Sequence, residues 1–236
     1  ATTLHITIMT TMDCNFRCIY CFEKHKEIYM SDHTIDIVQR MIDKKLDEGY
    51  SRLSVDWYGG EPLLNMNCIR HLSTYFIQLC KNKGIEYIAS ITTNGYSFTP
   101  DIQHELFALG VTHAQITLDG SKKTHDKRRI LLSGDSSFDK IKHNIVNACD
   151  GMTISLRVNV DNENQDDLLS LIQSFKGYCS ELLSIYACIV TPALDSNYVV
   201  KDRESLMKSI VDMYAYALKC GFQINIINNL LSSDYR

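Results

Sequence analysis

The stretch LHITIMTTMDCNFRCIYC, residues 4–21, joins a strand pattern to a cluster of cysteines. Residues 4–11 alternate between apolar and polar side chains and are rich in β-branched types, which is typical of a β-strand. Cys14, Cys18 and Cys21 follow, separated by three residues and then by two. Thiolates are soft ligands that suit iron–sulfur clusters and zinc, so the loop is predicted to bind a metal. Three ligands are one short of a tetrahedral set.

Strand and helix patterns alternate along the rest of the chain. Further strands are predicted at 52–58, 85–93, 112–118, 153–160, 183–190 and 222–228. Helices are predicted at 31–49, in the segment that ends near residue 84, and at about 100–109, 138–149, 164–176 and 202–220. Such alternation indicates right-handed crossovers and a parallel sheet. The fold class is therefore α/β, and both a doubly wound sheet and a full or partial barrel fit the pattern. We expect one domain over residues 1–236, because no linker interrupts the chain.

Polar and glycine residues gather where the predicted strands end. The cysteine loop follows the first strand, Gly59-Gly60 the second, Asn94-Gly95 the third and Asp119-Gly120 the fourth. In parallel α/β folds the carboxyl ends of the strands carry the chemistry. We therefore expect the functional site at this edge.

Composition limits the cellular compartment and the binding partners that we expect for this chain. The 236 residues carry a net charge of −4, which gives no reason to expect nucleic acid or an anionic membrane as a partner. No signal peptide or membrane-spanning run is evident. Nine cysteines, an odd number, indicate a reducing cytoplasm, where a cysteine cluster more often binds metal than forms disulfides. The cysteines outside the cluster are expected in the core.

The cysteine spacing leaves two kinds of metal site open. An iron–sulfur cluster with four irons would keep one iron exchangeable when only three thiolates bind. A structural zinc site would need a fourth ligand, and His25 lies four residues beyond Cys21. Asp13 and Glu23 are nearby oxygen donors. A non-catalytic zinc module of this kind is the alternative from another functional class.

Four segments together resemble one enzyme family. CNFRCIYC resembles the Cys-x3-Cys-x-aromatic-Cys motif of radical S-adenosylmethionine enzymes, with Tyr20 as the aromatic residue. YGGEP at 58–62 is similar to the GGEP motif of that family. TTNG at 92–95 and TLDGSKKTHDKRR at 117–129 resemble later segments of its peptide-modifying branch. The motifs occur in the family's order and each follows a predicted strand.

The resemblance implies a fold, two cofactors and a set of residues. The fold would be a partial (β/α)6 barrel of the TIM type, and the cofactors would be a [4Fe–4S] cluster and S-adenosylmethionine. Cys14, Cys18 and Cys21 would bind the cluster. The methionyl group would be held by the backbone of Gly59 and Gly60, by the Glu61 side chain, and through its carboxylate by Thr117 and Arg129. Tyr20 and Val190 would line the adenine pocket, and Asn94 would lie near the ribose.

Several positions carry a second interpretation. Asn94-Gly95 also fits a plain turn, Asp119 a helix cap, and Val190 a core residue. Arg128 is expected to be a surface charge, and Asn159 could face substrate. No catalytic base can be named.

The chain departs from the family pattern at two places. Many peptide-modifying relatives carry glutamine before GGEP, whereas this chain has Tyr58. Such relatives usually continue into a cysteine-rich SPASM domain with auxiliary clusters, and no such cysteine run follows Cys188 here.

The resemblance implies an oxidoreductase that modifies a precursor peptide or a protein. The product would be a cross-link in a ribosomally made peptide, or alternatively formylglycine as in anaerobic sulfatase maturation. A member acting on tRNA or a small molecule is a further alternative. The enzyme would need a reducing electron donor of the flavodoxin or ferredoxin type.

Overall fold

A computed structural model describes residues 2–178, 180–190 and 201–224 of the chain. Within it the chain divides into two compact units, and β5 (Val111–Thr117) begins in the first and ends in the second. The first unit contains Ala1–Asn15, Glu23–Ala114 and Ala148–Met152, and the second contains Phe16–Phe22, Gln115–Asn147 and Thr153–Arg236. No helix in the described part of the chain is long and apolar enough to cross a membrane.

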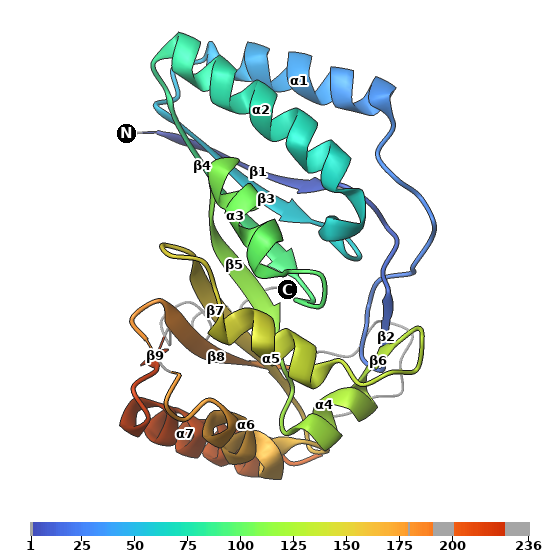
Figure 1. The fold of residues 1–236 in the computed structure, drawn as a ribbon, viewed down its shortest axis with the longest axis vertical. Coiled ribbons are helices and arrows are strands. Elements are labelled where there is room, and N and C mark those ends of the chain that lie inside the picture. Colours follow the sequence, from blue (N-terminus) through green and yellow to red (C-terminus); the bar gives the residue numbers. More distant parts are fainter. Residues whose placement is uncertain (1, 179, 191–200, 225–236) are drawn as a thin grey trace. The chain divides into compact units, whose positions relative to one another are not determined.

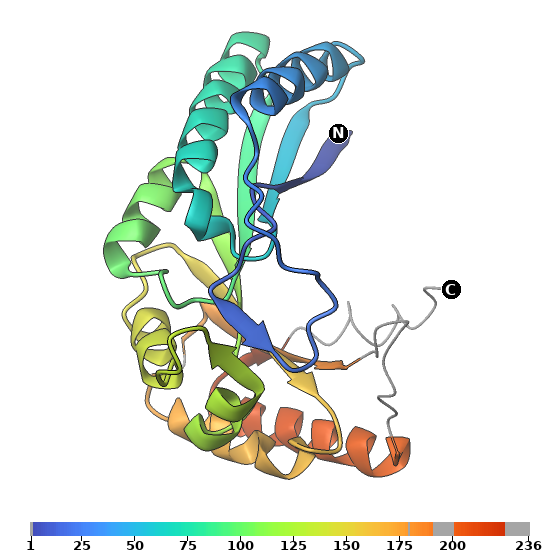
Figure 2. The same ribbon diagram turned by 90° about the vertical axis from the view of Figure 1, so that its right-hand side faces the viewer.

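The first unit is a parallel sheet with its helices packed together. Its elements are β1 (Thr3–Met9), α1 (Asp32–Leu46), β3 (Arg52–Tyr58), a 3-10 turn (Pro62–Asn65), α2 (Met66–Lys83), β4 (Glu86–Thr93) and α3 (Pro100–Ala108). The strand order is β1-β3-β4-β5, and β3 pairs in parallel with both β1 and β4. Figures 1 and 2 show α1 and α2 lying together over these strands.

Local chemistry explains the ends of these helices. Ser31 begins α1 by accepting a hydrogen bond from the Thr34 backbone N–H, and Thr99 begins α3 in the same way. Gly84 ends α2 in the left-handed conformation, with φ of 66°. Between the helices and the sheet lies an apolar core that includes the fully buried Trp57.

The second unit repeats the strand–helix alternation and adds a small ribbon. Its elements are β2 (Phe16–Cys18), α4 (Lys122–Arg128), β6 (Arg129–Leu131), α5 (Phe138–Val146), β7 (Thr153–Val160), a 3-10 turn (Gln165–Asp167), α6 (Leu168–Ser174), β8 (Leu183–Ile189), α7 (Arg203–Lys219) and β9 (Gln223–Ile224). The sheet order is β5-β7-β8-β9, while β2 and β6 form a separate antiparallel pair. In Figure 1, α6 and α7 lie side by side along β8.

The predicted strands 52–58 and 153–160 are confirmed without a shift of either end. Other elements agree to within a few residues, except that the helix predicted at 164–176 is a 3-10 turn followed by the shorter α6. The sequence did not predict β2, α4 or β6. Two of these are three-residue strands and the third is a polar helix, so none has enough apolar residues to show a period. Cys179 and residues 225–228 of the last predicted strand lie outside the described residues.

Candidate functional site

The two glycines after β3 lie against the segment that precedes the cysteines. The Gly60 N–H donates to the Thr11 carbonyl, and the Glu61 N–H donates to the Asp13 carbonyl at 2.8 Å. A Cβ added to Gly59 or Gly60 would lie 2.3 Å from the carbonyl oxygen of Thr11 or Asp13, respectively. The glycines are therefore required by this close approach of the chain to itself. Their predicted contact with a methionyl group stays a prediction.

Glu61 is fully buried and ties the segment after β3 to the segment after β4. One carboxylate oxygen accepts from the Leu63 N–H and the Thr93 hydroxyl, and the other accepts from the Asn94 N–H at 2.7 Å. These bonds give the carboxylate a structural function in the first unit. The resemblance also implied that Glu61 accepts a hydrogen bond from the ammonium group of S-adenosylmethionine, and this second role stays a prediction.

Asn94 forms the turn that the sequence suggested and also a side-chain link. Its Oδ1 accepts from the Tyr96 N–H, and Gly95 has φ of 81°. Its Nδ2 donates to Oδ1 of Asn15, which directly follows Cys14. Cys14 itself is buried, and its N–H donates to Oδ1 of Asp13. The first unit thus brings Cys14, the glycines, Glu61 and Asn94 into one hydrogen-bonded region.

In the second unit the cysteine loop pairs with the predicted arginine motif. Cys18 lies directly opposite Arg129 in the antiparallel pair of β2 and β6. The Cys21 N–H donates to the Cys18 carbonyl, which turns the loop back on itself. Burial raises the pKa of the Cys18 thiol, and the Arg129 guanidinium opposes that rise. The pairing explains how residues more than a hundred positions apart come together.

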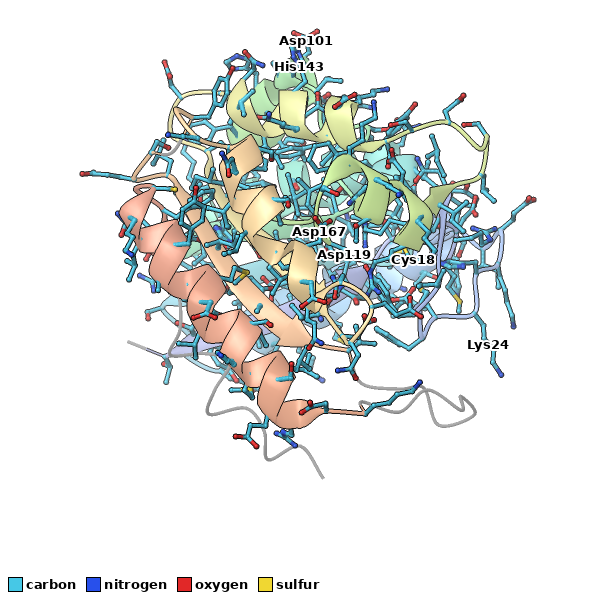
Figure 3. All side chains as sticks on the ribbon, turned by 90° about the horizontal axis from the view of Figure 1, so that it is seen from below. Cys18, Lys24, Asp101, Asp119, His143 and Asp167 are labelled. Carbon is cyan, nitrogen blue, oxygen red and sulfur yellow. The ribbon has the colours of Figure 1, made fainter. Side chains whose placement is uncertain are left out.

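Tyr20 connects Arg129 to a buried aspartate. Its hydroxyl donates to Oδ2 of Asp119 and accepts from Arg129 at 3.0 Å. Asp119 is fully buried, and its other oxygen accepts from the Asn159 N–H. Burial raises the pKa of Asp119, while Arg129, Tyr20 and Arg128 oppose the rise. Asp119 is therefore not a helix cap but the acceptor at the centre of this network, and Figure 3 labels it together with Cys18.

Arg128 is buried, so the expectation of a surface charge was wrong. Only 2% of its side chain is exposed, and its two terminal nitrogens donate to the two oxygens of Asp161 at 2.9 and 2.7 Å. Its Nε lies 3.6 Å from Oδ2 of Asp119. The bidentate pair supplies a counter-charge and two hydrogen bonds to the buried guanidinium, whose Nε has no hydrogen-bond partner among the described residues.

Asn164 closes the network through the backbone. Its Nδ2 donates to the carbonyls of Asp119 and Asn159, and its Oδ1 accepts from the Asp161 N–H. The sequence analysis missed Asp161 and Asn164. Their only signal was a run of polar residues at the carboxyl end of a predicted strand, where loops usually carry such residues.

Two buried arginine donors in the second unit, Nε of Arg128 and Nε of Arg129, lack an acceptor among the described residues. Nε of Arg129 has no hydrogen-bond partner among the described residues, although 92% of the residue is out of contact with solvent. Thr117 at the end of β5 and Val190 after β8 are also buried. A guanidinium with an unused donor fits a carboxylate, which is the group that the resemblance assigned to Arg129 and Thr117. The residues present therefore fit a bound amino-acid carboxylate.

The three cysteines are divided between the units. Cys14 belongs to the first unit, and Cys18 and Cys21 belong to the second. In the described part of the chain no three side chains of the types His, Cys, Asp and Glu stand close enough to share one metal ion. The eight cysteines that the structure describes form no disulfide. The ligand set of Cys14, Cys18 and Cys21 therefore stays a prediction.

Comparison with known families identifies the class of protein. Residues 8–175, more than half of the chain, match the Radical SAM superfamily. The chain therefore belongs to the radical SAM superfamily, whose members use a [4Fe–4S] cluster and S-adenosylmethionine.

Individual relatives differ in what they act on. The chain is 25% identical over 240 residues to the radical SAM cyclopropyl synthase TigE of Paramaledivibacter caminithermalis, covering 92% of this chain and 47% of the relative. It is 27% identical over 180 residues to a GTP 3′,8-cyclase of Campylobacter jejuni, covering 73% and 52%. The chain thus spans about half the length of these curated relatives.

A solved structure confirms the fold class. Native anSMEcpe with bound AdoMet and the Kp18Cys peptide superposes with a TM-score of 0.74 and 19% identity, covering 94% of this chain and 63% of that one. The predicted α/β fold of the radical SAM partial-barrel type is thereby confirmed. At this identity the likeness speaks to fold alone.

Proposed function

We propose that this chain is the S-adenosylmethionine-cleaving part of an enzyme that modifies a peptide or a protein. The observation that carries the proposal is the pairing of β2 with β6, which puts Cys18 opposite Arg129 and leaves a buried donor of Arg129 unused. Cofactor cleavage at the cluster would supply a 5′-deoxyadenosyl radical that abstracts a hydrogen atom from the substrate. The protein supplies placement and exclusion of water.

Each predicted residue has a role in this proposal. Cys14, Cys18 and Cys21 hold the cluster as thiolates. Arg129 and Thr117 bind the methionyl carboxylate. Tyr20, whose hydroxyl is held between Arg129 and Asp119, lines the adenine pocket.

The backbone around Gly59 and Gly60, with Glu61, receives the methionyl ammonium. Asn94 and Val190 contact the nucleoside. No residue is assigned as a catalytic base.

A peptide substrate is favoured by the solved neighbour that holds the Kp18Cys peptide. We propose a cross-link as the product, with formylglycine as the alternative within the same chemistry. The similarity to a GTP 3′,8-cyclase supports a second candidate, a nucleotide substrate. We place the enzyme in the cytoplasm, with a flavodoxin or ferredoxin as electron donor and without a nucleic-acid or membrane partner.

The first test is anaerobic reconstitution with iron and sulfide, followed by EPR of the reduced protein. We expect a [4Fe–4S]+ signal that changes when S-adenosylmethionine is added, together with formation of 5′-deoxyadenosine. Cys18→Ala should abolish both, whereas Cys220→Ala, at the end of α7, should leave both in place. Uptake of a single zinc ion by the wild-type protein, without a cluster signal, would refute the proposal.

The substrate classes are then separated by product analysis. Incubation with candidate peptides should give products that have lost hydrogen, detected by mass spectrometry, while GTP should stay unchanged. A cross-linked cysteine peptide keeps its sulfur, whereas conversion of that cysteine to formylglycine exchanges the sulfur for oxygen, and the same spectra show this difference. Formylglycine made from serine is identified by reaction of its aldehyde with a hydrazine. Conversion of GTP without any peptide product would favour the nucleotide candidate.

A further inference from the structure

The two faces of the sheet in the second unit differ in chemistry. Side chains of alternate residues in β7 and β8 point to opposite faces. One face carries buried apolar residues such as Leu156, Val158 and Ile185. The other carries a set of polar side chains, namely Gln115 and Thr117 of β5, Ser155, Arg157 and Asn159 of β7, and Ser184, Tyr186 and Cys188 of β8.

The strand register places these polar residues opposite one another. Arg157 is paired with Tyr186 and Asn159 with Cys188, while the Ser155 and Ser184 hydroxyls lie 2.9 Å apart. Strands of a parallel sheet are normally apolar on both faces, because both are packed. A polar face on these strands is therefore better suited to a ligand than to a core.

Arg157 lies at the middle of this face and is held by neutral groups. Its Nε donates to Oδ1 of Asn159 at 2.8 Å, and one terminal nitrogen contacts Sγ of Cys188 at 3.3 Å. The Tyr186 hydroxyl donates to Oε1 of Gln115, and burial raises the pKa of Tyr186 to about 12. The phenol therefore stays neutral at physiological pH.

The charge of Arg157 has no counter-charge in the described part of the chain. Arg157 takes part in none of the ion pairs found among the described residues, whose arginine members include Arg52, Arg70 and Arg128. Arg157 is only half-buried, so water can still reach it. A guanidinium fixed by neutral acceptors on a polar face is pre-organised for an anion, and its planar fork matches a carboxylate.

We propose that Arg157, with Gln115 and Tyr186 beside it, binds a carboxylate of the peptide substrate. This inference rests on the proposed function, because it names the group that the enzyme would recognise. The carboxylate could belong to an acidic side chain or to the C-terminus of the peptide, since both present the same pair of oxygens. Arg157 acts in substrate binding and is distinct from Arg129, which is assigned to the cofactor.

The test measures binding of matched peptides to the reconstituted holoenzyme with S-adenosylmethionine, by isothermal titration calorimetry. The first pair of capped peptides differs only in a central Glu or Gln, and the second pair only in a free or an amidated C-terminus. One member of a pair should bind about tenfold more tightly, as expected for a charged hydrogen-bonded pair. The pair that shows the difference identifies the source of the carboxylate.

Variants connect this preference to Arg157. Arg157→Gln should abolish the preference, and Arg157→Lys should keep only part of it, because lysine retains the charge without the fork. Arg40→Gln, on the exposed side of α1, is the matched control and should behave as wild type. Formation of 5′-deoxyadenosine without peptide should persist in Arg40→Gln, and the same measurement on the two Arg157 variants shows whether either substitution affects the cofactor site.

The outcomes separate this inference from the proposed function. If the wild type forms no 5′-deoxyadenosine, the proposed function fails. If it forms 5′-deoxyadenosine but shows no carboxylate preference in either pair, or binds none of the peptides, the role of Arg157 is refuted. Loss of basal cofactor cleavage in both Arg157 variants would instead assign Arg157 to the cofactor site and refute the inference. A preference in the wild type that Arg157→Lys alters and Arg40→Gln does not would support it even if Arg157→Gln did not fold.

Discussion

The two units hold their predicted site residues by different physical means. In the first unit, Gly59 and Gly60 let the backbone approach Thr11 and Asp13, and the segments are joined by backbone hydrogen bonds and by hydrogen bonds from neutral groups to the buried carboxylate of Glu61. In the second unit, buried charges hold the site, with Arg128 between Asp119 and Asp161. The first region is therefore sensitive to added volume, and the second is sensitive to any unpaired charge.

The largest expected loss of stability comes from the substitution Asp161→Asn. The substitution keeps the volume but removes the charge that pairs with a guanidinium that is 2% exposed. The substitution leaves the two buried guanidinium groups of Arg128 and Arg129 with the single buried carboxylate of Asp119, so we expect a loss of about 3 kcal/mol in the free energy of unfolding. Urea denaturation followed by circular dichroism measures it.

The control for Asp161→Asn is an ion pair of the same unit at the surface. Asp139 pairs with Lys122, and both side chains are more than half exposed. Asp139→Asn should change stability by less than about 1 kcal/mol. Equal effects of the two substitutions would show that burial does not separate the two pairs, and the charge-sensitive description of the second unit would be wrong.

Gly60→Ala tests the volume-sensitive region. Its Cβ would lie 2.3 Å from the Asp13 carbonyl oxygen, and this contact is with backbone rather than with a flexible side chain. We expect a loss of about 2–3 kcal/mol from overpacking, again measured by urea denaturation. Gly84→Ala is the matched control, because nothing lies within 4 Å of its added Cβ and only its φ of 66° is unfavourable. A cost for Gly84→Ala equal to that for Gly60→Ala would indicate that crowding is not the cause.

The difference between the units also explains what the sequence could predict. The glycines and Glu61 were singled out because they lie side by side in one motif, and their role toward a cofactor stays a prediction. The long strands were predicted correctly because alternation over seven or eight residues is a clear signal. The burial of Arg128 and Asp161 was not predicted, because the sequence does not show that a charged side chain is buried unless its partner is known. Here the partners are 33 residues apart. The pairing of β2 with β6 was missed for the same reason, since three-residue strands are specified by their partners.

His125 gives a smaller, pH-dependent effect in the second unit. The side chain is fully buried beside Phe138, and burial, together with the nearby Arg129, lowers its pKa well below the usual value. The folded protein therefore keeps the imidazole neutral, while the unfolded chain takes up a proton below about pH 6.5. Stability should fall as the pH drops from about 6.5 toward 5, by up to about 1.4 kcal/mol per pH unit.

His125→Gln should make this pH slope shallower, because glutamine can still reach Ser137 but does not titrate. Denaturant midpoints between pH 5 and 7.5 measure the slope. His33→Gln, at the exposed start of α1, is the control. An unchanged slope in His125→Gln would mean that other groups cause the pH dependence.

The smallest expected effect comes from a second bidentate pair, at the surface of the first unit. Arg70 donates through Nε and a terminal nitrogen to the two oxygens of Glu105, whereas Arg128 donates to Asp161 through both terminal nitrogens. In the Arg70–Glu105 pair 44% and 35% of the side chains are exposed. The hydrogen bonds from Arg70 lower the pKa of Glu105. The contribution of this pair to stability is therefore present above the pKa of Glu105 in the unfolded chain, which is near 4.5. It is lost as the pH falls through the lower pKa of Glu105 in the folded protein.

Because water and salt screen an exposed pair, Glu105→Gln should lower the free energy of unfolding by less than about 1 kcal/mol at pH 7. The decrease should be smaller still at pH 3 or in high salt. Denaturant midpoints at the two pH values, with and without added salt, measure the effect. A loss of stability as large as that of Asp161→Asn would mean that bidentate pairing, rather than burial, sets the strength of the pair. A small cost shows instead that the same hydrogen bonds stabilise little where water can replace them, and that the sensitivity of the second unit arises from the burial of its charges.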